Sequence, residues 1–324
     1  MNGEFTVIDT FSGAGGSSLG WHKAGYRELL AVEIDPNAIA TFRSNFPTTP
    51  IYAGDISYLT SDMCMKAVGI QPGELDVFSG SPPCQGFSGM GKQLLNDPRN
   101  QLFVQYARLL KDLQPKVFVM ENVTGMISGH MKSAYLEVIK TFRECGYKAK
   151  GQVLNAKYYG VPQDRERVII IGVREDLGIE PSHPKPFSKP ITFSQAIANL
   201  SIPANEPPNK PTPLEVERWH QLPIGENKAD KNFGWHRKAH VKLHPDQVVP
   251  TIVKTSASLP FHPTESRRLH VCEAARIAGF PDDFKWVGSR SERIARIGNC
   301  VPPPLMEAIA LHIKNQILVK IGVG

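Results

Sequence analysis

The chain has 324 residues, of which 41% are hydrophobic and 21% are charged, and its formal net charge is +6. This balance is typical of a folded globular protein and excludes a disordered chain, and no apolar run approaches the length that spans a membrane. The first residues lack a basic leader followed by an apolar stretch, so we expect a soluble protein of the cytoplasm. The positive charge favours a polyanionic partner, although many basic proteins bind no nucleic acid.

Up to about residue 174, short β-rich runs alternate with longer amphipathic segments, a pattern that predicts a parallel α/β sheet. The predicted strands are 5–11, 29–34, 51–52, 75–78, 116–120, 147–154 and 167–173. Prolines then become frequent, and strand periodicity disappears until 247–253. A chain of this length usually forms more than one core. We therefore expect one domain at 1–180, completed by 297–324, and a smaller, loop-rich domain at 181–296.

A glycine-rich loop follows the first predicted strand. Residues 9–17 read Asp-Thr-Phe-Ser-Gly-Ala-Gly-Gly-Ser and lead into a predicted helix. Glycines let a ligand lie against the backbone, but such turns also arise for steric reasons alone. Glu33 ends the next strand, 20 residues after Gly13. Its carboxylate is placed to bind a ribose diol, and Ile34 to cover one face of an adenine.

The third predicted strand ends at Asp55, and two interpretations of this residue remain open. Its carboxylate can accept a hydrogen bond from a ligand amino group, or it can cap the helix that follows. The glycine loop lacks the full G-x-G-x-x-G spacing of dinucleotide-binding proteins. We therefore predict an adenosine-containing donor such as S-adenosylmethionine as the ligand.

Cys84 is the candidate nucleophile. It follows strand 75–78, and two prolines directly before it fix the approach of the chain, while Gly86 lets another group come close. Most cysteines are small buried hydrophobes, but a thiolate needs polar, open surroundings such as these. Neither C-x-x-C spacing nor suitable histidine partners accompany the other cysteines, so we expect no metal site and no disulfide at Cys64, Cys145, Cys272 and Cys300.

Three charged residues flank the later strands. Glu121 ends the apolar strand 116–120 and should lie in the same crevice as Cys84, although a surface carboxylate is the alternative. Arg165 and Arg167 precede the last predicted strand, two residues apart and so on the same face. A guanidinium fork suits a carbonyl oxygen, a phosphate or the Glu121 carboxylate, whereas an ion-pair ladder with neighbouring acids is the alternative.

The C-terminal part predicts two further helices. Residues 271–278 form a helical pattern closed by Gly279 and a proline, which together act as a stop signal. A last helix is expected to begin at Pro303 or Pro304 and to run toward Ile317.

Taken together, these segments resemble the cytosine-5 DNA methyltransferases. The resembling segments follow the family's order over nearly the whole chain and comprise 9–16, 80–88, 121–123, 163–167, 268–284 and 298–303. The resemblance implies a Rossmann-like, S-adenosylmethionine-dependent methyltransferase sheet with helices on both faces, plus a smaller loop-rich DNA-recognition domain. It also implies a monomer that acts on double-stranded DNA in a bacterial cytoplasm or phage-infected cell, with a cognate restriction endonuclease as a candidate partner.

The resemblance assigns roles to the candidate residues. Cys84 would add to C6 of a flipped-out cytosine, and Glu121 would contact its N3 and amino edge. Arg165 and Arg167 complete the catalytic set, with Arg167 expected to contact the base. Asn299 would contact the amino-acid end of the cofactor, which requires the C-terminal part to fold back beside the first strand. The full cofactor set comprises Phe11, Gly13, Gly15, Glu33, Ile34, Asp55, Ile56, Pro82, Leu102, Asn299 and Val301.

The segment from about 182 to 263 is the expected DNA-reading part. Within it, 231–242 carries basic and aromatic residues without an acid, although a solvated basic loop has the same composition. The candidate DNA contacts are Gln85, Ser88, Lys92, Trp235, Arg237, Lys238, Lys242, Arg267 and Arg268.

Three other functions are alternatives to this interpretation. A tRNA cytosine methyltransferase would share the chemistry but not the substrate. A catalytically dead DNA-binding relative would lack Cys84 or Glu121, both of which are present. A nucleotide-dependent oxidoreductase would bind nicotinamide, for which a thiolate has no use.

Overall fold

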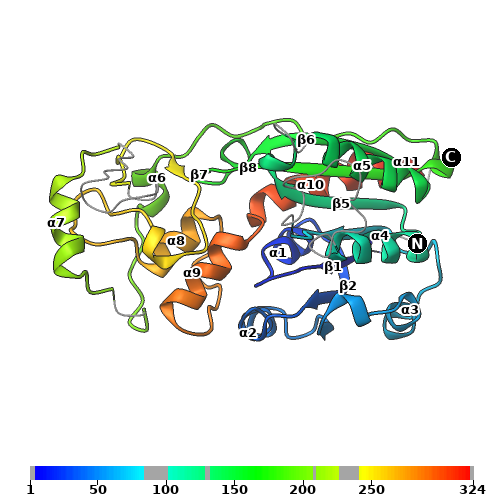
Figure 1. Cartoon of the computed structure of the whole chain (residues 1–324), viewed down its shortest axis with the longest axis horizontal. Coiled ribbons are helices and arrows are strands. Elements are labelled where there is room, and N and C mark those ends of the chain that lie inside the picture. The colour runs from blue at the N-terminus through cyan, green and yellow to red at the C-terminus, as the bar shows by residue number, and fades with distance from the viewer. Residues whose placement is uncertain (1–3, 84–100, 128–131, 207–208, 226–240, 322–324) are drawn as a thin grey trace. The chain divides into compact units, whose positions relative to one another are not determined.

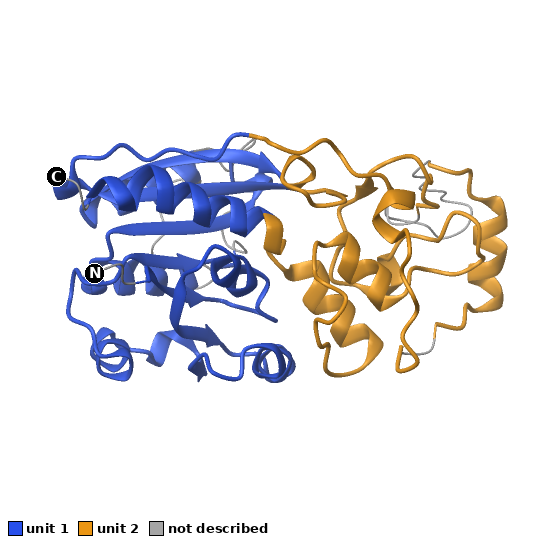
Figure 2. Cartoon of the chain, turned by 180° about the vertical axis from the view of Figure 1, so that it is seen from behind, with its two compact units in different colours: residues 1–155, 166–185, 305–324 blue, residues 156–165, 186–304 orange. Residues whose placement is uncertain are grey.

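The structure is a computed structural model that describes residues 4–83, 101–127, 132–206, 209–225 and 241–321. The chain divides into two compact units (Figure 2). Unit 1 comprises 1–155, 166–185 and 305–324, and unit 2 comprises 156–165 and 186–304. The expected domains, divided near 181 and 296, differ from these units chiefly at 156–165, which belongs to unit 2, and at 297–304.

Unit 1 is built on a seven-stranded sheet with the strand order β3-β2-β1-β4-β5-β8-β6 (Figure 1). The α/β class is therefore confirmed. Each predicted strand is present, and their bounds are β1 Thr6–Thr10, β2 Arg27–Glu33, β3 Ile51–Ala53, β4 Val77–Gly80, β5 Val117–Val123, β6 Tyr147–Asn155 and β8 Glu166–Arg174.

The expectation of a purely parallel sheet is wrong for one strand. The first five strands in the sequence pair in parallel, but β8 lies antiparallel to both of its neighbours, β5 and β6. No long crossover joins β6 to β8, so the chain turns back directly into an antiparallel pairing. The start of β8 consequently lies at the carboxyl end of β5.

Helices cover both faces of the sheet. On one face, Tyr106 of α4 and Phe142 of α5 pack with Phe78 and Phe118 in the main hydrophobic core. On the other face, Trp21 of α1 donates to the Ser79 hydroxyl of β4. The helices of this unit are α1 Gly16–Lys23, α2 Pro36–Asn45, α3 Ser61–Val68, α4 Gln101–Leu113 and α5 Lys132–Glu144.

The C-terminal helix starts at a predicted proline. Helix α10 spans Pro303–Ile313 and continues through a π-helical turn, Lys314–Leu318, into α11, Val319–Ile321. The Tyr26 hydroxyl donates to the carbonyl of Ala310 at 3.0 Å. The C-terminal part therefore folds back beside the first strands, as the resemblance requires.

Unit 2 consists of short helices and loops around one small strand pair. Its helices are α6 Phe193–Ile197, α7 Pro213–Gln221, α8 Val271–Ile277 and α9 Arg290–Asn299, and β7 Gln163–Asp164 pairs in parallel with β9 Val249–Pro250. Gly279 follows α8 with φ +87°, which confirms the predicted stop. Among the residues that the structure describes, none forms a helix long and apolar enough to span a membrane.

Candidate active site

The glycine loop adopts a backbone that few side chains tolerate. Phe11, Gly13 and Gly15 all have positive φ, at +58°, +57° and +96°. A Cβ on Gly15 would collide with the ring of Phe46, whereas one on Gly13 would meet no atom within 4 Å. Positive φ in a phenylalanine stores strain, which is typical of ligand-binding loops. Gly13 therefore presents its backbone to open space, where a ligand can approach.

Glu33 fastens this loop to the end of β2. One carboxylate oxygen accepts the Gly13 amide at 2.8 Å, and the other accepts the amides of Ile34 and Asp35 at 2.9 and 2.8 Å. The Ile34 side chain is 60% exposed. An exposed isoleucine beside a carboxylate, next to an open glycine backbone, fits the apolar face and the diol of a nucleoside.

The other predicted cofactor residues of unit 1 serve the fold in their present contacts. Asp55 caps the 3₁₀ turn that begins at Ile56 by accepting the Ser57 amide at 2.8 Å. Hydrogen bonds from Ser57 lower the pKa of Asp55. Ile56 is buried in the main core, and Leu102 packs against it. The capping interpretation of Asp55 is thus observed.

Asn122 holds the proline segment beside the end of β5. Its side-chain amide donates to the Pro82 carbonyl at 3.0 Å, and its amide oxygen accepts the Val123 amide at 2.9 Å. A Cβ on Gly80 would collide with the Thr10 hydroxyl, so only glycine lets the ends of β4 and β1 approach this closely. The chain two residues before Cys84 is therefore fixed next to Glu121, while Cys84 itself lies outside the described residues.

Glu121 and Arg167 form an ion pair with Nε 2.9 Å from the carboxylate. Their side chains are 11% and 14% exposed, so the pair is largely shielded from water. The pairing arises because the start of the antiparallel β8 lies beside the carboxyl end of β5. Arg167 thus contacts the Glu121 carboxylate, and its Nη1 also donates to the Glu166 carbonyl at 2.7 Å.

Arg165 does not share the position of Arg167. Strand β8 begins at Glu166, so Arg165 lies outside it. Arg165 belongs to unit 2 and is 3% exposed. Its guanidinium donates to the carbonyls of Ile252, Gly298 and Cys300 at 3.1, 3.0 and 2.8 Å. The expectation that both arginines lie on one strand face is therefore wrong, and Arg165 organises the segment before α10.

The cofactor residues predicted near the C-terminus lie in that segment. Asn299 is exposed at the end of α9, and Val301 is buried. A Cβ on Gly298 would collide with the backbone of Val253 and Lys254, so this glycine is required for close packing.

The described candidates for DNA contact are engaged within unit 2. The Arg267 guanidinium pairs with Glu273 at 2.8 Å, and Arg268 pairs with Glu215 at 2.7 Å with a 6% exposed side chain. The Lys242 ammonium lies 3.6 Å from the Trp219 ring centre. The charges of these three candidate DNA contacts are therefore engaged by acidic or aromatic partners inside the unit. Outside the described residues lie the other six candidates, Gln85, Ser88, Lys92, Trp235, Arg237 and Lys238.

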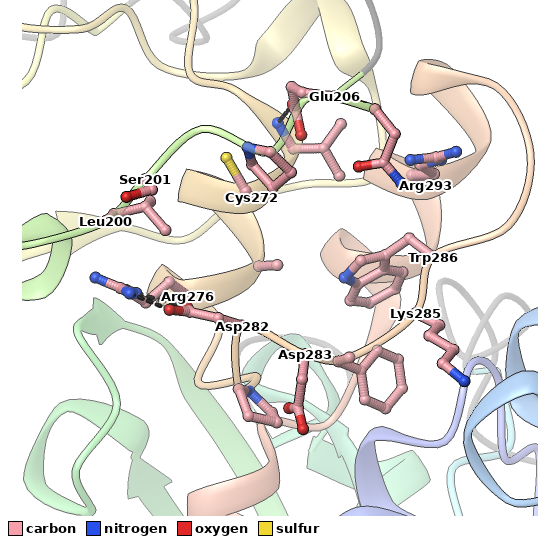
Figure 3. Close-up of a pocket in the computed structure, with 16 residues that line it drawn as sticks. Leu200, Ser201, Glu206, Cys272, Arg276, Asp282, Asp283, Lys285, Trp286 and Arg293 are labelled. Carbon is pink, nitrogen blue, oxygen red and sulfur yellow. Dashed lines mark hydrogen bonds and ion pairs between the residues drawn. The ribbon is translucent and has the colours of Figure 1, made fainter.

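Unit 2 contains a pocket of about 270 Å³ that no predicted catalytic or cofactor residue lines (Figure 3). Arg276 pairs with Asp282 at one side of this pocket. The Glu206 carboxylate accepts the first amide of α8, from Val271. Trp286 contributes to an aromatic cluster with Phe284 and its neighbour Phe280. These charged and aromatic groups hold the lining segments together, so we do not place the active site here.

No disulfide joins the cysteines that the structure describes, and their environments differ from that expected for a nucleophile. Burial raises the pKa of Cys64 to about 11 and that of Cys272 to about 12, so neither is a thiolate at neutral pH. Within the described ranges, no cluster of histidine, cysteine and acidic side chains could hold a metal ion.

Comparison with known proteins defines the family. A family model for C-5 cytosine-specific DNA methylases matches residues 5–315, and the chain therefore belongs to this family. Its activity is that of a DNA (cytosine-5-)-methyltransferase. The Type II methyltransferase M1.HphI of Haemophilus parahaemolyticus is 36% identical over 94% of this chain and 85% of its own length. M.NgoPII of Neisseria gonorrhoeae is 36% identical, with 96% of each chain covered.

Solved structures agree with the fold. A protein assigned as a DNA modification methyltransferase encoded within an Escherichia coli prophage superposes with a TM-score of 0.81 and 27% identity, covering 97% of this chain and 99% of that one. The DNMT2 of Spodoptera frugiperda shares the fold, with a TM-score of 0.67, 19% identity, and 99% and 100% coverage.

Proposed function

We propose that the chain transfers a methyl group from S-adenosylmethionine to C5 of a cytosine that has been flipped out of duplex DNA. The observation that carries this proposal is the shielded Glu121–Arg167 pair beside the Asn122-anchored proline segment that leads to Cys84. Its relatives M1.HphI and M.NgoPII are named Type II methyltransferases, which supports a role as the modification enzyme of a restriction-modification system. A cognate endonuclease acting on the same site is the expected partner.

Cytosine C5 is a poor nucleophile and must be activated before it can accept a methyl group. We propose that Cys84 activates it by adding to the neighbouring C6. The thiolate forms a bond to C6, and the electron pair of the C5–C6 double bond moves toward C5. The Glu121 carboxylate accepts hydrogen bonds from the amino group and from the protonated N3 of the base, which favours addition at C6, and Arg167 holds the carboxylate in position for this contact. C5 then accepts the methyl group, and loss of the C5 proton restores the double bond and expels the thiolate. The S–C6 bond is thus made and broken within one turnover.

S-adenosylmethionine, when bound, supplies a methyl group made electrophilic by a sulfonium. The residues of the glycine loop fit such a ligand: Gly13 faces open space, Ile34 exposes an apolar surface and Glu33 lies between them. We propose Phe11, Gly15, Pro82 and Leu102 as further residues of the cofactor site. We also propose Asn299 and Val301 as cofactor residues, as the resemblance to the family implies.

A base inside a duplex hides its C6 face, so base flipping is part of the proposal. Extrusion costs a few kcal/mol, which DNA contacts must offset. We assign catalysis to unit 1 and target recognition to unit 2, in a monomer. Because Lys242, Arg267 and Arg268 are engaged internally, the proposed contacts are Gln85, Ser88, Lys92, Trp235, Arg237 and Lys238.

A mechanism-based trap tests the covalent step. Duplex DNA containing 5-fluorocytosine is incubated with the enzyme and S-adenosylmethionine, because fluorine at C5 blocks the elimination that releases the thiolate. The expected result is an adduct that survives denaturing electrophoresis and is missing with Cys84→Ser. Methylation of tRNA but not of duplex DNA would refute the proposed substrate, and normal methyl transfer by Cys84→Ser would refute the covalent mechanism.

A further inference from the structure

Asp9 is a buried carboxylate that the proposed chemistry does not use. It lies on β1 and is 1% exposed. Its main-chain carbonyl accepts a hydrogen bond from the Ser12 hydroxyl at 2.7 Å, and its carboxylate accepts one from the Ser17 hydroxyl at 2.5 Å. Ser12 begins the glycine loop, and Ser17 lies in the first turn of α1. One residue therefore fastens both ends of the loop that carries Gly13.

The loop needs such support because its conformation is unfavourable in isolation. A positive φ at a residue such as Phe11 costs on the order of 1 kcal/mol or more and persists only where surrounding contacts impose it. Ser12 supplies further contacts: its amide donates to the Val32 carbonyl at 3.1 Å, and its hydroxyl accepts the Val32 amide at 3.3 Å. Asp9 and β2 thus hold the start of the loop together.

Asp9 also connects this loop to the strand that leads toward Cys84. Ser79 lies opposite Asp9 in the register of β1 and β4, and its hydroxyl bonds to the Asp9 carboxylate. The same hydroxyl accepts the Trp21 ring N–H at 3.3 Å. The carboxylate therefore joins β1, β4 and α1 directly beneath the loop.

We propose that Asp9 is a positioning residue for the methyl donor, holding the glycine loop through Ser12, Ser17 and Ser79 in the conformation that receives it. This inference rests on the function proposed for the loop. A loop that must first be ordered binds its ligand more weakly, by the fraction of molecules in the competent conformation. Loss of the Asp9 contacts therefore raises the Kd and KM for the donor and leaves kcat at saturating donor nearly unchanged.

Protonation of Asp9 provides a second signature. Burial, and secondarily the Glu28 carboxylate on β2, raise the pKa of Asp9 to about 7. The other titratable groups near this network are His22 of α1, 3.0 Å from Glu28, and the buried Tyr106 phenol of α4. A protonated carboxyl group becomes a hydrogen-bond donor, so one of the serine hydroxyls that donate to Asp9 must reorient. The affinity of the protein for the methyl donor is therefore expected to weaken as the pH falls from 8 to 6.

Calorimetry with the stable product S-adenosylhomocysteine, at pH 8 and pH 6, tests the proposal. At pH 8, Asp9→Asn and Ser17→Ala are each expected to raise the Kd roughly tenfold, the value of one hydrogen bond to a charged group. Their combination should raise the Kd by less than the product of the two single effects, because both changes act on the Asp9–Ser17 contact. In Asp9→Asn, the Kd should no longer depend on pH through this range.

Ser18→Ala is the matched control. Ser18 is the next residue of α1, is fully buried, and donates to the Glu28 carboxylate at 2.7 Å, so its loss costs comparable stability. It should lower Tm as much as Ser17→Ala while leaving the Kd unchanged. Equal weakening of the Kd by Ser17→Ala and Ser18→Ala, or a pH dependence that persists in Asp9→Asn, overturns the positioning role. A wild-type protein that binds no S-adenosylhomocysteine would instead overturn the proposed function of the loop.

Discussion

Glu121 on β5 and Arg167 on β8 are diagonal neighbours across an antiparallel strand pair, joined by an ion pair of 2.9 Å. In the register, Glu121 lies opposite Ile169, and Arg167 lies opposite Val123. Had β8 been parallel, its first residues would lie at the far edge of the sheet. The reversal of a single strand therefore brings a guanidinium to the carboxyl edge where the other strands end.

Glu121→Gln is expected to lower kcat by roughly 10²- to 10⁴-fold, the usual contribution of a positioned acid or base. Arg167→Lys, which keeps the charge but loses the planar fork, should lower kcat by a smaller factor. Single-turnover methylation of duplex DNA at saturating donor measures both. Because neither residue is placed in the glycine loop, the Kd for S-adenosylhomocysteine should stay at the wild-type value. Full activity of Glu121→Gln would remove this residue from the catalytic set.

Asn122→Ala tests the anchor of the proline segment. The change leaves the buried Pro82 carbonyl without its side-chain partner, which costs about 1–3 kcal/mol, and removes one hydrogen bond to the amide of the exposed Val123. We expect a lower Tm together with a fall in kcat, because the chain before Cys84 loses its attachment to β5. Asn45→Ala serves as the control, since it removes one side-chain bond to the Thr41 carbonyl on α2. Equal retention of kcat by both variants would contradict the role of Asn122.

Local patterns in the sequence predicted the elements that depend on local physics. Apolar runs located every strand of the large sheet, and the glycine loop and the stop at Gly279 follow from backbone constraints that neighbouring residues impose. The rule that parallel strands end at one edge also placed Glu33 at the end of β2, whereas β5 continues two residues past Glu121, to Val123.

The features that sequence reasoning missed depend on partners far along the chain. The direction of β8 is set by its pairing with β5 and β6, and the buried Arg268 pairs with Glu215 of α7, 53 residues earlier in the chain. A basic residue has the same local pattern whether it faces DNA or an internal acid. The role of Asp9 cannot be predicted from its sequence neighbours, because it depends on contacts of its carboxylate with Ser17 and Ser79.

Arg268→Ala distinguishes an internal arginine from a DNA contact. Removing a buried guanidinium leaves Glu215 without its partner, so we expect a loss of about 3 kcal/mol in the free energy of unfolding. The dependence of DNA affinity on salt should keep its slope, because no phosphate contact is lost. Lys238→Ala, by contrast, should reduce that slope by about one and leave Tm unchanged. Binding titrations at several salt concentrations measure this slope. If Arg268→Ala lowered it and Lys238→Ala did not, Arg268 would be the DNA contact.

His183 is expected to make the stability of unit 1 depend on pH. The ring is 9% exposed and bonds to the Ile169 carbonyl at 2.9 Å. Burial lowers its pKa to about 4, below the ordinary value of 6.5. Between these values the unfolded chain binds a proton that the folded chain does not, so the stabilisation is present above about pH 6.5 and is lost as the pH falls toward 4. The full difference corresponds to roughly 3 kcal/mol.

Asp9 acts in the opposite direction over nearly the same range. Its pKa is raised from 3.8 to about 7, so its contribution is present below about pH 4 and is lost as the pH rises through 7. The two effects offset each other in the wild-type protein, and single variants separate them. Urea unfolding midpoints are measured at pH 5, 6 and 7. In His183→Gln the midpoint should fall as the pH rises. In Asp9→Asn it should rise with pH more steeply than in the wild-type protein. If His183→Gln kept the wild-type dependence of the urea midpoint on pH, His183 would titrate as an exposed histidine does.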